Sequence, residues 1–222
     1  MTLMSVNRGA VRYAQSMVRA GSATAPLNEV KRLAVIDHVL SATRRLVLAN
    51  GLDVTMDQLA EVSGVSRRTL FRHFDTREKL VAAAFEAGMA GYRDQLPRFD
   101  GDVDRWLRDT CSAVHRQNST IGPGFFELAS RNDLPRDLAA AERRRRIEFR
   151  SVADDVARTL WSATGGMGSM PDELVDTVTL HLSPFFTAAS AIDAGQTWER
   201  AAEAAYLAIS NSATSAAAER TR

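Results

Sequence analysis

Three neighbouring side chains near residue 68 have the chemistry to read the edges of nucleic-acid bases. Arg67 and Arg68 each carry a guanidinium group, which offers two parallel donors that match O6 and N7 of guanine. Thr69 follows directly, and its hydroxyl and methyl groups suit a base edge or the methyl group of thymine. These groups can read a sequence only if a rigid element presents them outward.

The residues before this cluster predict a short helix that ends in a tight turn. Thr55 and Gln58 stand three apart in the S/T-x-x-E/Q arrangement, in which each side chain caps the other residue's amide. Gly64 reaches the left-handed conformation that a helix end often needs. The inner face of this helix is expected to contain Leu59, Ala60 and Val62.

A second short helix is expected to begin after Ser66, whose hydroxyl can cap it. Leu70 and Phe74, four residues apart, face inward against the first helix. The residues left on the outward face are Arg67, Arg68, Thr69 and Arg72. A generic helical hairpin with solvated arginines is the alternative, but the caps, the turn and the basic face all agree with helix-turn-helix spacing.

At these residues the chain resembles the TetR family, the tetracycline-repressor-like bacterial regulators, from about Val30 to Phe85. That family's recognition helix has the form G-V-S-x-x-T-[LI]-[YF]-x-[HY]-F, followed by x-[ST]-K-E-x-L. Residues 64–74 read GVSRRTLFRHF and residues 75–80 read DTREKL. Two departures are Phe71, where a tyrosine is common, and Arg77, where a lysine is common.

The resemblance implies a DNA-binding role for a defined set of residues. Arg67, Arg68 and Thr69 would meet base edges, while Thr55, His73 and Arg77 would stand where family members touch phosphates. Phe71 lacks the tyrosine hydroxyl and would contact only a sugar or a thymine methyl. The full expected DNA-binding set is Thr55, Ser66, Arg67, Arg68, Thr69, Phe71, Arg72, His73 and Arg77.

Hydrophobic residues recur every three or four positions from Asn28 onward, and no segment alternates as a strand would, so we expect an all-α fold of about nine helices. We expect an N-terminal extension over 1–27, a three-helix helix-turn-helix domain over 28–80, a larger ligand-binding and dimerisation domain over 81–217, and a tail over 218–222. The first helix, over 28–50, is expected to bury Leu33, Ile36, Leu40, Thr43 and Val47. Later helices are expected at 76–96, 103–119, 123–131, 135–163, 171–192 and 197–217.

The resemblance also implies that the second domain encloses a small, largely apolar effector. An apolar helix face looks the same whether it meets a ligand or another helix, so ordinary core packing remains the alternative for each candidate. The expected lining is Trp106, Thr110, Cys111, Val114, Phe125, Phe126, Arg145, Phe149, Val152, His181 and Phe185.

Arg145 stands out because it falls within the apolar stripe of the helix over 135–163. An unpaired buried charge is costly, so Arg145 is expected to find an acidic partner, water or a ligand. Glu142 lies near the same stripe and is the internal candidate. A pocket arginine would instead favour an anionic effector, and the sequence leaves both interpretations open.

The last two helices predict a homodimer. The helix over 171–192 is apolar on more than one side and therefore needs two partners, and the sequence leaves open whether Ser183-Pro184 kinks or restarts it. The helix over 197–217 has a face of small residues that permits close approach. A two-fold dimer would place two recognition helices on a palindromic operator of double-stranded DNA, about 34 to 36 Å apart. One larger monomeric core is the alternative.

Composition excludes several classes of protein. The chain has 222 residues, 45% of them hydrophobic, with no run of about 20 uncharged apolar residues and no apolar block typical of a secretory signal near residue 1. A single cysteine, Cys111, fits a reducing compartment, so we expect a cytoplasmic protein. Cys111 and His115 lack a third ligand for a metal, and no cofactor motif or catalytic set is found.

These observations together predict a homodimeric DNA-binding transcription regulator, expected to be a repressor that leaves its operator when a small molecule binds. The positive charge supports this, since residues 31–80 carry nine Lys/Arg against six Asp/Glu, whereas residues 81–222 carry sixteen against twenty. The alternatives are an effector-independent DNA-binding or protein-interaction module with a solid second domain, and a helical enzyme with an incidental helix-turn-helix.

Overall fold

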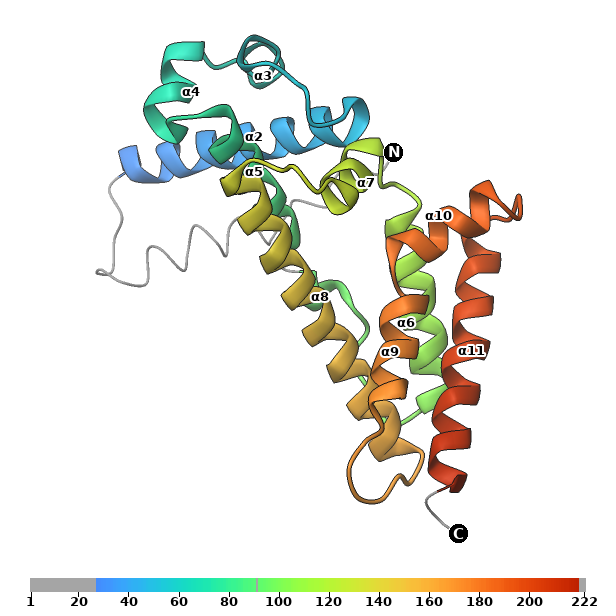
Figure 1. The fold of residues 1–222 in the computed structure, drawn as a ribbon. Helices are drawn as coiled ribbons and strands as arrows, with labels where there is room; N and C mark the ends of the chain where they lie inside the picture. The colour runs from blue at the N-terminus through green and yellow to red at the C-terminus, as the bar shows by residue number, and fades with distance from the viewer. Residues whose placement is uncertain (1–26, 91, 220–222) are drawn as a thin grey trace, which may run out of the picture. The chain divides into compact units, whose positions relative to one another are not determined.

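The computed structural model describes residues 27–90 and 92–219. Over these residues the chain forms ten α-helices, one 3-10 helix and no strand, which confirms the all-α prediction (Figure 1). The expected N-terminal extension lies outside the described residues apart from Leu27, as do the last three residues of the tail. None of the described helices is both long and apolar enough to cross a membrane.

The helices match most of the predicted ranges. In chain order they are α2 (Leu27–Asn50), α3 (Met56–Ser63), α4 (Arg67–Phe74), α5 (Arg77–Met89), the 3-10 helix η1 (Arg93–Gln95), α6 (Val103–Asn118), α7 (Pro123–Ser130), α8 (Arg136–Ala163), α9 (Asp172–His181), α10 (Pro184–Ile192) and α11 (Trp198–Glu219).

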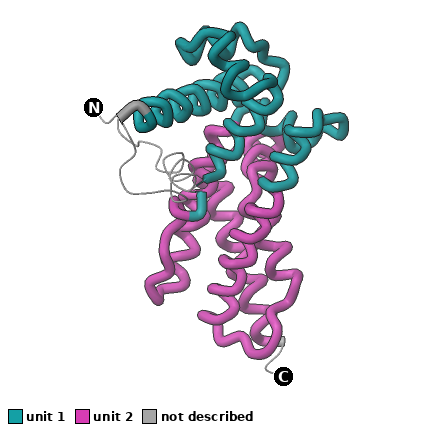
Figure 2. Tube along the Cα trace, turned by 90° about the vertical axis from the view of Figure 1, so that its left-hand side faces the viewer, with its two compact units in different colours: residues 1–93, 122–145 teal, residues 94–121, 146–222 magenta. Residues whose placement is uncertain are grey.

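Two compact units form, and each combines segments that are separate in the sequence (Figure 2). The first unit contains the described residues up to Arg93 together with residues 122–145, so α7 and the start of α8 join α2 to α5. The second unit contains residues 94–121 and the described residues from Arg146 onward, which include α6, the rest of α8 and α9 to α11.

The core of the first unit lies between α2, α3, α4 and α5, and it also includes Leu128 of α7 and Leu138 and Ala141 of α8. Leu40, Thr43 and Val47 of α2 are buried as predicted, whereas Leu33 and Ile36 are only half-buried. Val62 was expected on the inner face of α3, but it is 42% exposed, so that prediction is wrong. An eight-residue helix has only about two turns, and Met56, Leu59 and Ser63 already fill its buried face.

Helix α7 packs directly onto the carboxyl end of α2. A Cβ atom added at Gly122 would overlap the Leu48 carbonyl, and one added at Gly124 would overlap the Val47 carbonyl. These two glycines therefore permit a backbone-to-backbone approach that a side chain would prevent.

The second unit is built around α6 and α11, with α9 and α10 packed against α11. Its apolar core includes Trp106, Leu107, Cys111, Val114, Ala153, Val156, Ala157, Leu160, Trp161, Leu174, Val175, Val178, Leu182, Ala202, Ala205, Tyr206, Ile209 and Ala213. The small residues on α11 leave room for α6 to lie close.

Two predicted helices are corrected by the structure. The helix expected over 76–96 ends at Met89, because Ala90 adopts an extended backbone and Tyr92 then closes a turn onto the Met89 carbonyl at 3.0 Å. The helix expected over 171–192 is two helices, because Pro184 has no N–H to continue α9 and Ser183 caps α10 by accepting from the Phe186 amide at 3.1 Å. This break raises the helix number from nine to ten.

Candidate nucleic-acid interface

The segment from Thr55 to Gly64 forms the capped helix and turn that the sequence predicts. The Thr55 hydroxyl accepts from the Gln58 amide at 3.3 Å, and the Gln58 side chain accepts from the Thr55 amide at 2.8 Å. Gly64 ends α3 at φ 63° and ψ 19°, which is the left-handed conformation. The start and end of α3 are therefore both fixed by local chemistry.

Helix α4 turns a basic face outward. The Ser66 hydroxyl accepts from the Thr69 amide at 3.2 Å and so caps the helix. Leu70 is 1% exposed and Phe74 is half-buried, so the inward pair is as predicted. The exposed residues on α4 are Arg67, Arg68, Phe71, Arg72 and His73, while Thr69 is intermediate.

The arginines on α4 differ in how they are held. Arg67 pairs with Asp57 of α3 at 3.0 Å, and its guanidinium lies 5.4 Å from the centre of the Phe71 ring. Arg68 and Arg72 have no ion-pair partner among the residues that the structure describes. Arg68 can therefore present all of its donors to a bound molecule without first giving up an internal partner.

A sharp turn follows α4. Asp75 has φ 59° and ψ −51°, and the Thr76 amide donates to the Phe74 carbonyl at 2.6 Å, which defines a γ-turn centred on Asp75. This turn is rare and strained for a residue other than glycine. The Thr76 hydroxyl then caps α5 by accepting from the Lys79 amide at 3.2 Å.

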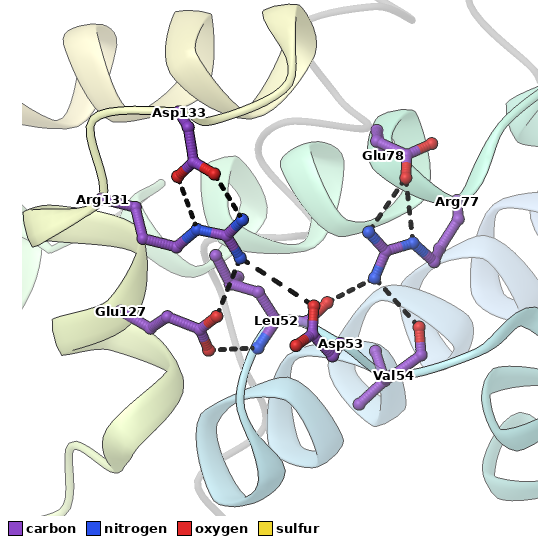
Figure 3. Close-up of polar contacts among 8 residues, drawn as sticks. All are labelled: Leu52, Asp53, Val54, Arg77, Glu78, Glu127, Arg131 and Asp133. Atoms are coloured by element: carbon purple, nitrogen blue, oxygen red, sulfur yellow. Dashed lines mark hydrogen bonds and ion pairs between the residues drawn. The ribbon is translucent and has the colours of Figure 1, made fainter.

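Arg77 is turned toward the protein in this structure. Its guanidinium donates to the carbonyls of Leu52 and Val54, the latter at 3.0 Å, and pairs with Glu78 at 2.9 Å (Figure 3). Its side chain is only 24% exposed. Arg77 therefore braces the loop that leads into α3.

Helix α7 holds the same loop from its other side. A Glu127 carboxylate oxygen accepts from the Leu52 amide at 2.6 Å, across 75 residues of sequence (Figure 3). Arg131 pairs with Glu127 and Asp133, each at 3.0 Å, and lies 3.9 Å from Asp53. The Arg131 guanidinium lowers the pKa of Asp133 through hydrogen bonding and charge.

The sequence did not predict that Arg77 and Glu127 hold the loop before α3. Only the i, i+4 spacing of Glu127 and Arg131 hints at an ion pair, and no local signal connects that pair with Leu52.

The comparisons with known proteins agree with this geometry. Residues 39–84, which cover the end of α2 through most of α5, match the family model for bacterial regulatory proteins, tetR family. These residues are a TetR-family DNA-binding domain. The chain is therefore a DNA-binding transcription regulator, and this type of domain implies dimerisation.

Solved structures share the fold over most of this chain. A putative transcriptional regulator from Pseudomonas aeruginosa PAO1 has 15% identity and a TM-score of 0.63, covering 89% of this chain and 96% of that one. The fatty acid degradation regulator FadR from Bacillus halodurans has 12% identity and a TM-score of 0.57, covering 85% and 96%. No curated protein sequence matches the chain.

The expected effector-lining residues are divided between the two units. Trp106, Thr110, Cys111, Val114 and Val152 are buried in the second unit, and Phe149 and His181 are half-buried there. Phe185 also belongs to the second unit and is 47% exposed. The remaining candidates, Phe125, Phe126 and Arg145, belong to the first unit.

Arg145 has an internal partner. Its guanidinium donates two hydrogen bonds to Glu142 at 2.6 and 2.8 Å and lies 4.9 Å from the centre of the Phe125 ring. Glu142 is only 4% exposed. Of the two interpretations that the sequence left open, the described contacts favour the acidic partner.

A buried polar cluster in the second unit was not predicted. His115 of α6 is 0% exposed, and its Nδ1 lies 2.8 Å from the Thr187 hydroxyl of α10. The Asn118 amide donates to the same hydroxyl at 3.1 Å and to the Leu182 carbonyl at 3.2 Å. Burial lowers the pKa of His115 to about 4 and raises the pKa of Cys111 to about 12, so both groups are neutral near pH 7.

Proposed function

We propose that this regulator recognises a palindromic operator through the outward face of α4. Arg67, Arg68 and Thr69 read base edges in the major groove. The observation that supports this most strongly is Arg68, an exposed arginine near the start of a doubly capped helix-turn-helix with its donors uncommitted among the described residues. Arg67 exchanges its contact with Asp57 for a base.

The residues around this centre hold the DNA backbone. Thr55, Ser66, Arg72 and His73 are exposed on α3 and α4 or just before them, where hydroxyl, guanidinium and imidazole groups can donate to phosphates. Phe71 offers an apolar contact to a sugar or a thymine methyl. Arg77 supports DNA binding by bracing the loop before α3, since its donors are engaged by the carbonyls of that loop and by Glu78.

The protein forms its homodimer through α9, α10 and α11. These helices leave large apolar side chains in solvent in the single chain: Leu180 (65% exposed), Phe185 (47%), Ile192 (80%) and Leu207 (49%). Exposed apolar residues gathered on adjoining helices favour a protein interface. A two-fold pairing of the same surface presents two α4 helices to one duplex.

The dimer is tested by Leu180→Asp, which places a charge in the proposed interface. Sedimentation at micromolar concentration is expected to show a dimer for the native chain and a monomer for the variant, with unchanged helix content. Arg116→Ala, an exposed change on α6, serves as the control and stays dimeric. A Leu180→Asp protein that remains dimeric contradicts the assigned interface.

The second unit responds to a small molecule, and the protein is a cytoplasmic repressor without a catalytic role. Its buried apolar residues on α6 and α8, including Trp106, Val114 and Val152, match a largely apolar effector in chemistry. Effector binding favours a dimer whose α4 helices no longer fit successive grooves. If no compound that stabilises the protein changes operator affinity, the effector-independent alternative holds instead.

Selection of bound sequences from random DNA tests the function directly. We expect an inverted repeat whose half-sites lie about 10 base pairs apart, centre to centre, or a multiple of that distance. Recovery of no preferred sequence, or of a single unrepeated half-site, contradicts sequence-specific recognition by a dimer.

A further inference from the structure

The buried residues of α9 define the side of this helix that faces the core of the second unit. Leu174, Val178 and Leu182 are all buried. At about 100° per residue, these three positions lie within about 80° of one another around a helix. If the helix continued without a break, Phe185 and Ile192 would fall within the same sector and would be buried with them.

Helix α10 has the reverse arrangement. Phe185 and Ile192 are exposed. Thr187 would lie about 180° from Val178 on an unbroken helix, on the side away from the core. It is nevertheless only 5% exposed. Figure 1 shows that α10 runs in a different direction from α9. The face that packs into the core therefore changes at the break before Pro184.

The burial of apolar surface does not explain which face α10 turns inward. Proline interrupts the helix but does not select the face that the next helix buries. Burying Phe185 and Ile192 would be favourable, whereas burying the Thr187 hydroxyl is costly unless it is hydrogen-bonded. The hydrogen bonds of Thr187 must therefore offset this difference.

Two residues of α6 supply those hydrogen bonds. The Asn118 side chain lies 3.2 Å from the Leu182 carbonyl, which can only accept, so the Asn118 atom there is the N–H₂ group. The same group donates to the Thr187 hydroxyl at 3.1 Å. The hydroxyl keeps its own proton for Nδ1 of His115, which lies 2.8 Å away. Asn118 is thus bonded on both sides of the break.

His115 also bonds to the end of α9. Burial lowers the pKa of His115 to about 4, and a hydrogen bond with the His181 backbone partly opposes this lowering. A bond that raises the pKa of a histidine is one in which the ring donates, so its partner is the His181 carbonyl. His181 ends α9 and Leu182 follows it, and carbonyls at a helix end have no partner within the helix. Helix α6 therefore satisfies the end of α9 and Thr187 of α10 together.

We propose that His115, Asn118 and Thr187 fix which face of α10 packs into the core, and so hold Phe185 and Ile192 outward as contacts for a second copy of this chain. The three are positioning residues, because they are buried and act through α10. This inference rests on the proposed homodimer and adds how its apolar surface is formed. Without these bonds, α10 turns its apolar side chains inward, and fewer chains are competent to pair.

Two substitutions at Thr187 separate its hydrogen bonds from its packing. Thr187→Val keeps the shape and removes the hydroxyl, whereas Thr187→Ser keeps the hydroxyl and removes a methyl group. The dimer dissociation constant of each protein is measured by sedimentation equilibrium. We expect an increase of about tenfold for Thr187→Val and of less than about threefold for Thr187→Ser. A role in packing alone predicts the opposite order, and that order, or equal constants for Thr187→Val and the native chain, overturns the proposal.

Leu160→Ala is the control for a general loss of stability. Leu160 is buried in the same core but lies on α8, outside the three helices of the proposed interface. The cavity is expected to lower the midpoint of denaturant unfolding and to leave the dimer dissociation constant within about threefold of the native value. If Leu160→Ala weakens the dimer as much as Thr187→Val does, loss of stability explains both results and the polar cluster has no positioning role.

The orientation of α10 is also measured in the monomer, by the thiol that Phe185→Cys introduces into Leu180→Asp protein. The native Cys111 gives little background reaction, because it is 0% exposed and burial raises its pKa to about 12. We expect Thr187→Val to slow the reaction with a thiol reagent about tenfold and Thr187→Ser to leave the rate unchanged. Equal rates in all three proteins overturn the proposal. A native chain that is itself monomeric contradicts the proposed homodimer alone, since the thiol rates still report the orientation of α10.

Discussion

The two compact units place their most distinctive polar groups differently. In the first unit, Arg67, Arg68 and Thr69 are consecutive in sequence and lie on the outward face of one short helix. In the second unit, His115 and Thr187 meet from helices that are 72 residues apart and are buried. An outward-facing polar surface can therefore be built from local sequence, whereas a buried polar cluster requires the tertiary fold.

The largest expected effect comes from a change inside the first unit. Gly124→Ala would force a methyl group into the Val47 carbonyl, and backbone cannot move aside as a side chain can. We expect a loss of about 3 kcal/mol in the free energy of unfolding, measured by denaturant titration. DNA affinity is expected to fall with it, because α7 supports the loop before α3.

Gly88→Ala is the matched control for this prediction. A Cβ atom there lies 2.6 Å from the end of the Arg44 side chain, which can move, and alanine favours the helix. We expect a change within about 1 kcal/mol. If Gly124→Ala is equally mild, the close approach of α7 to α2 is not needed for the first unit.

The second unit is tested through the pH dependence of stability. Burial lowers the pKa of His115 in the folded chain from its ordinary 6.5 to about 4, so the unfolded state binds the proton more readily between these values. The stabilising contribution is complete above about pH 6.5 and is lost as pH falls toward 4. Between pH 7 and pH 5 we expect a loss of about 2 kcal/mol from this residue.

His115→Phe removes this titration and keeps a ring of similar size. Denaturant titrations of the two proteins at pH 7 and pH 5 measure the difference in their pH dependence. The native chain is expected to lose about 2 kcal/mol more than the variant over this range. Parallel pH profiles would show that His115 is not held neutral in the core.

A smaller effect is expected at the turn after α4. Asp75→Gly removes the backbone strain of a positive φ at a residue other than glycine. The same change increases the conformational freedom of the unfolded chain and removes an exposed ion pair with Lys79, and both of these effects lower stability. We expect a net gain of about 1 kcal/mol in stability, read from thermal unfolding. A decrease would indicate that the turn is unstrained, or that the Lys79 pair contributes more than exposed pairs usually do.

The DNA-binding helices could be predicted from the sequence because their signals are local. The Thr55–Gln58 capping box, the left-handed Gly64 and the Ser66 cap all act within four residues, and each has the predicted geometry. Val62 was misplaced because a hydrophobic residue type does not establish burial in a helix of only two turns.

The remaining parts depend on contacts that sequence spacing does not encode. Glu127 reaches Leu52 across 75 residues, and Arg77 is turned inward by carbonyls that carry no sequence signal. From the sequence, His115 was considered only as a metal ligand without a third partner. Its hydrogen-bond partner Thr187 lies on α10, and the sequence left open whether a helix begins at Pro184.

The most direct test of sequence recognition by α4 compares Arg68→Ala with Arg116→Ala, two exposed arginines from different units. Affinities for the selected operator and for random DNA are measured at one salt concentration. We predict that Arg68→Ala weakens operator binding by about 1–3 kcal/mol with a much smaller effect on random DNA, while Arg116→Ala changes neither. Equal losses on both DNAs for Arg68→Ala, or no loss at all, would contradict base reading by this helix.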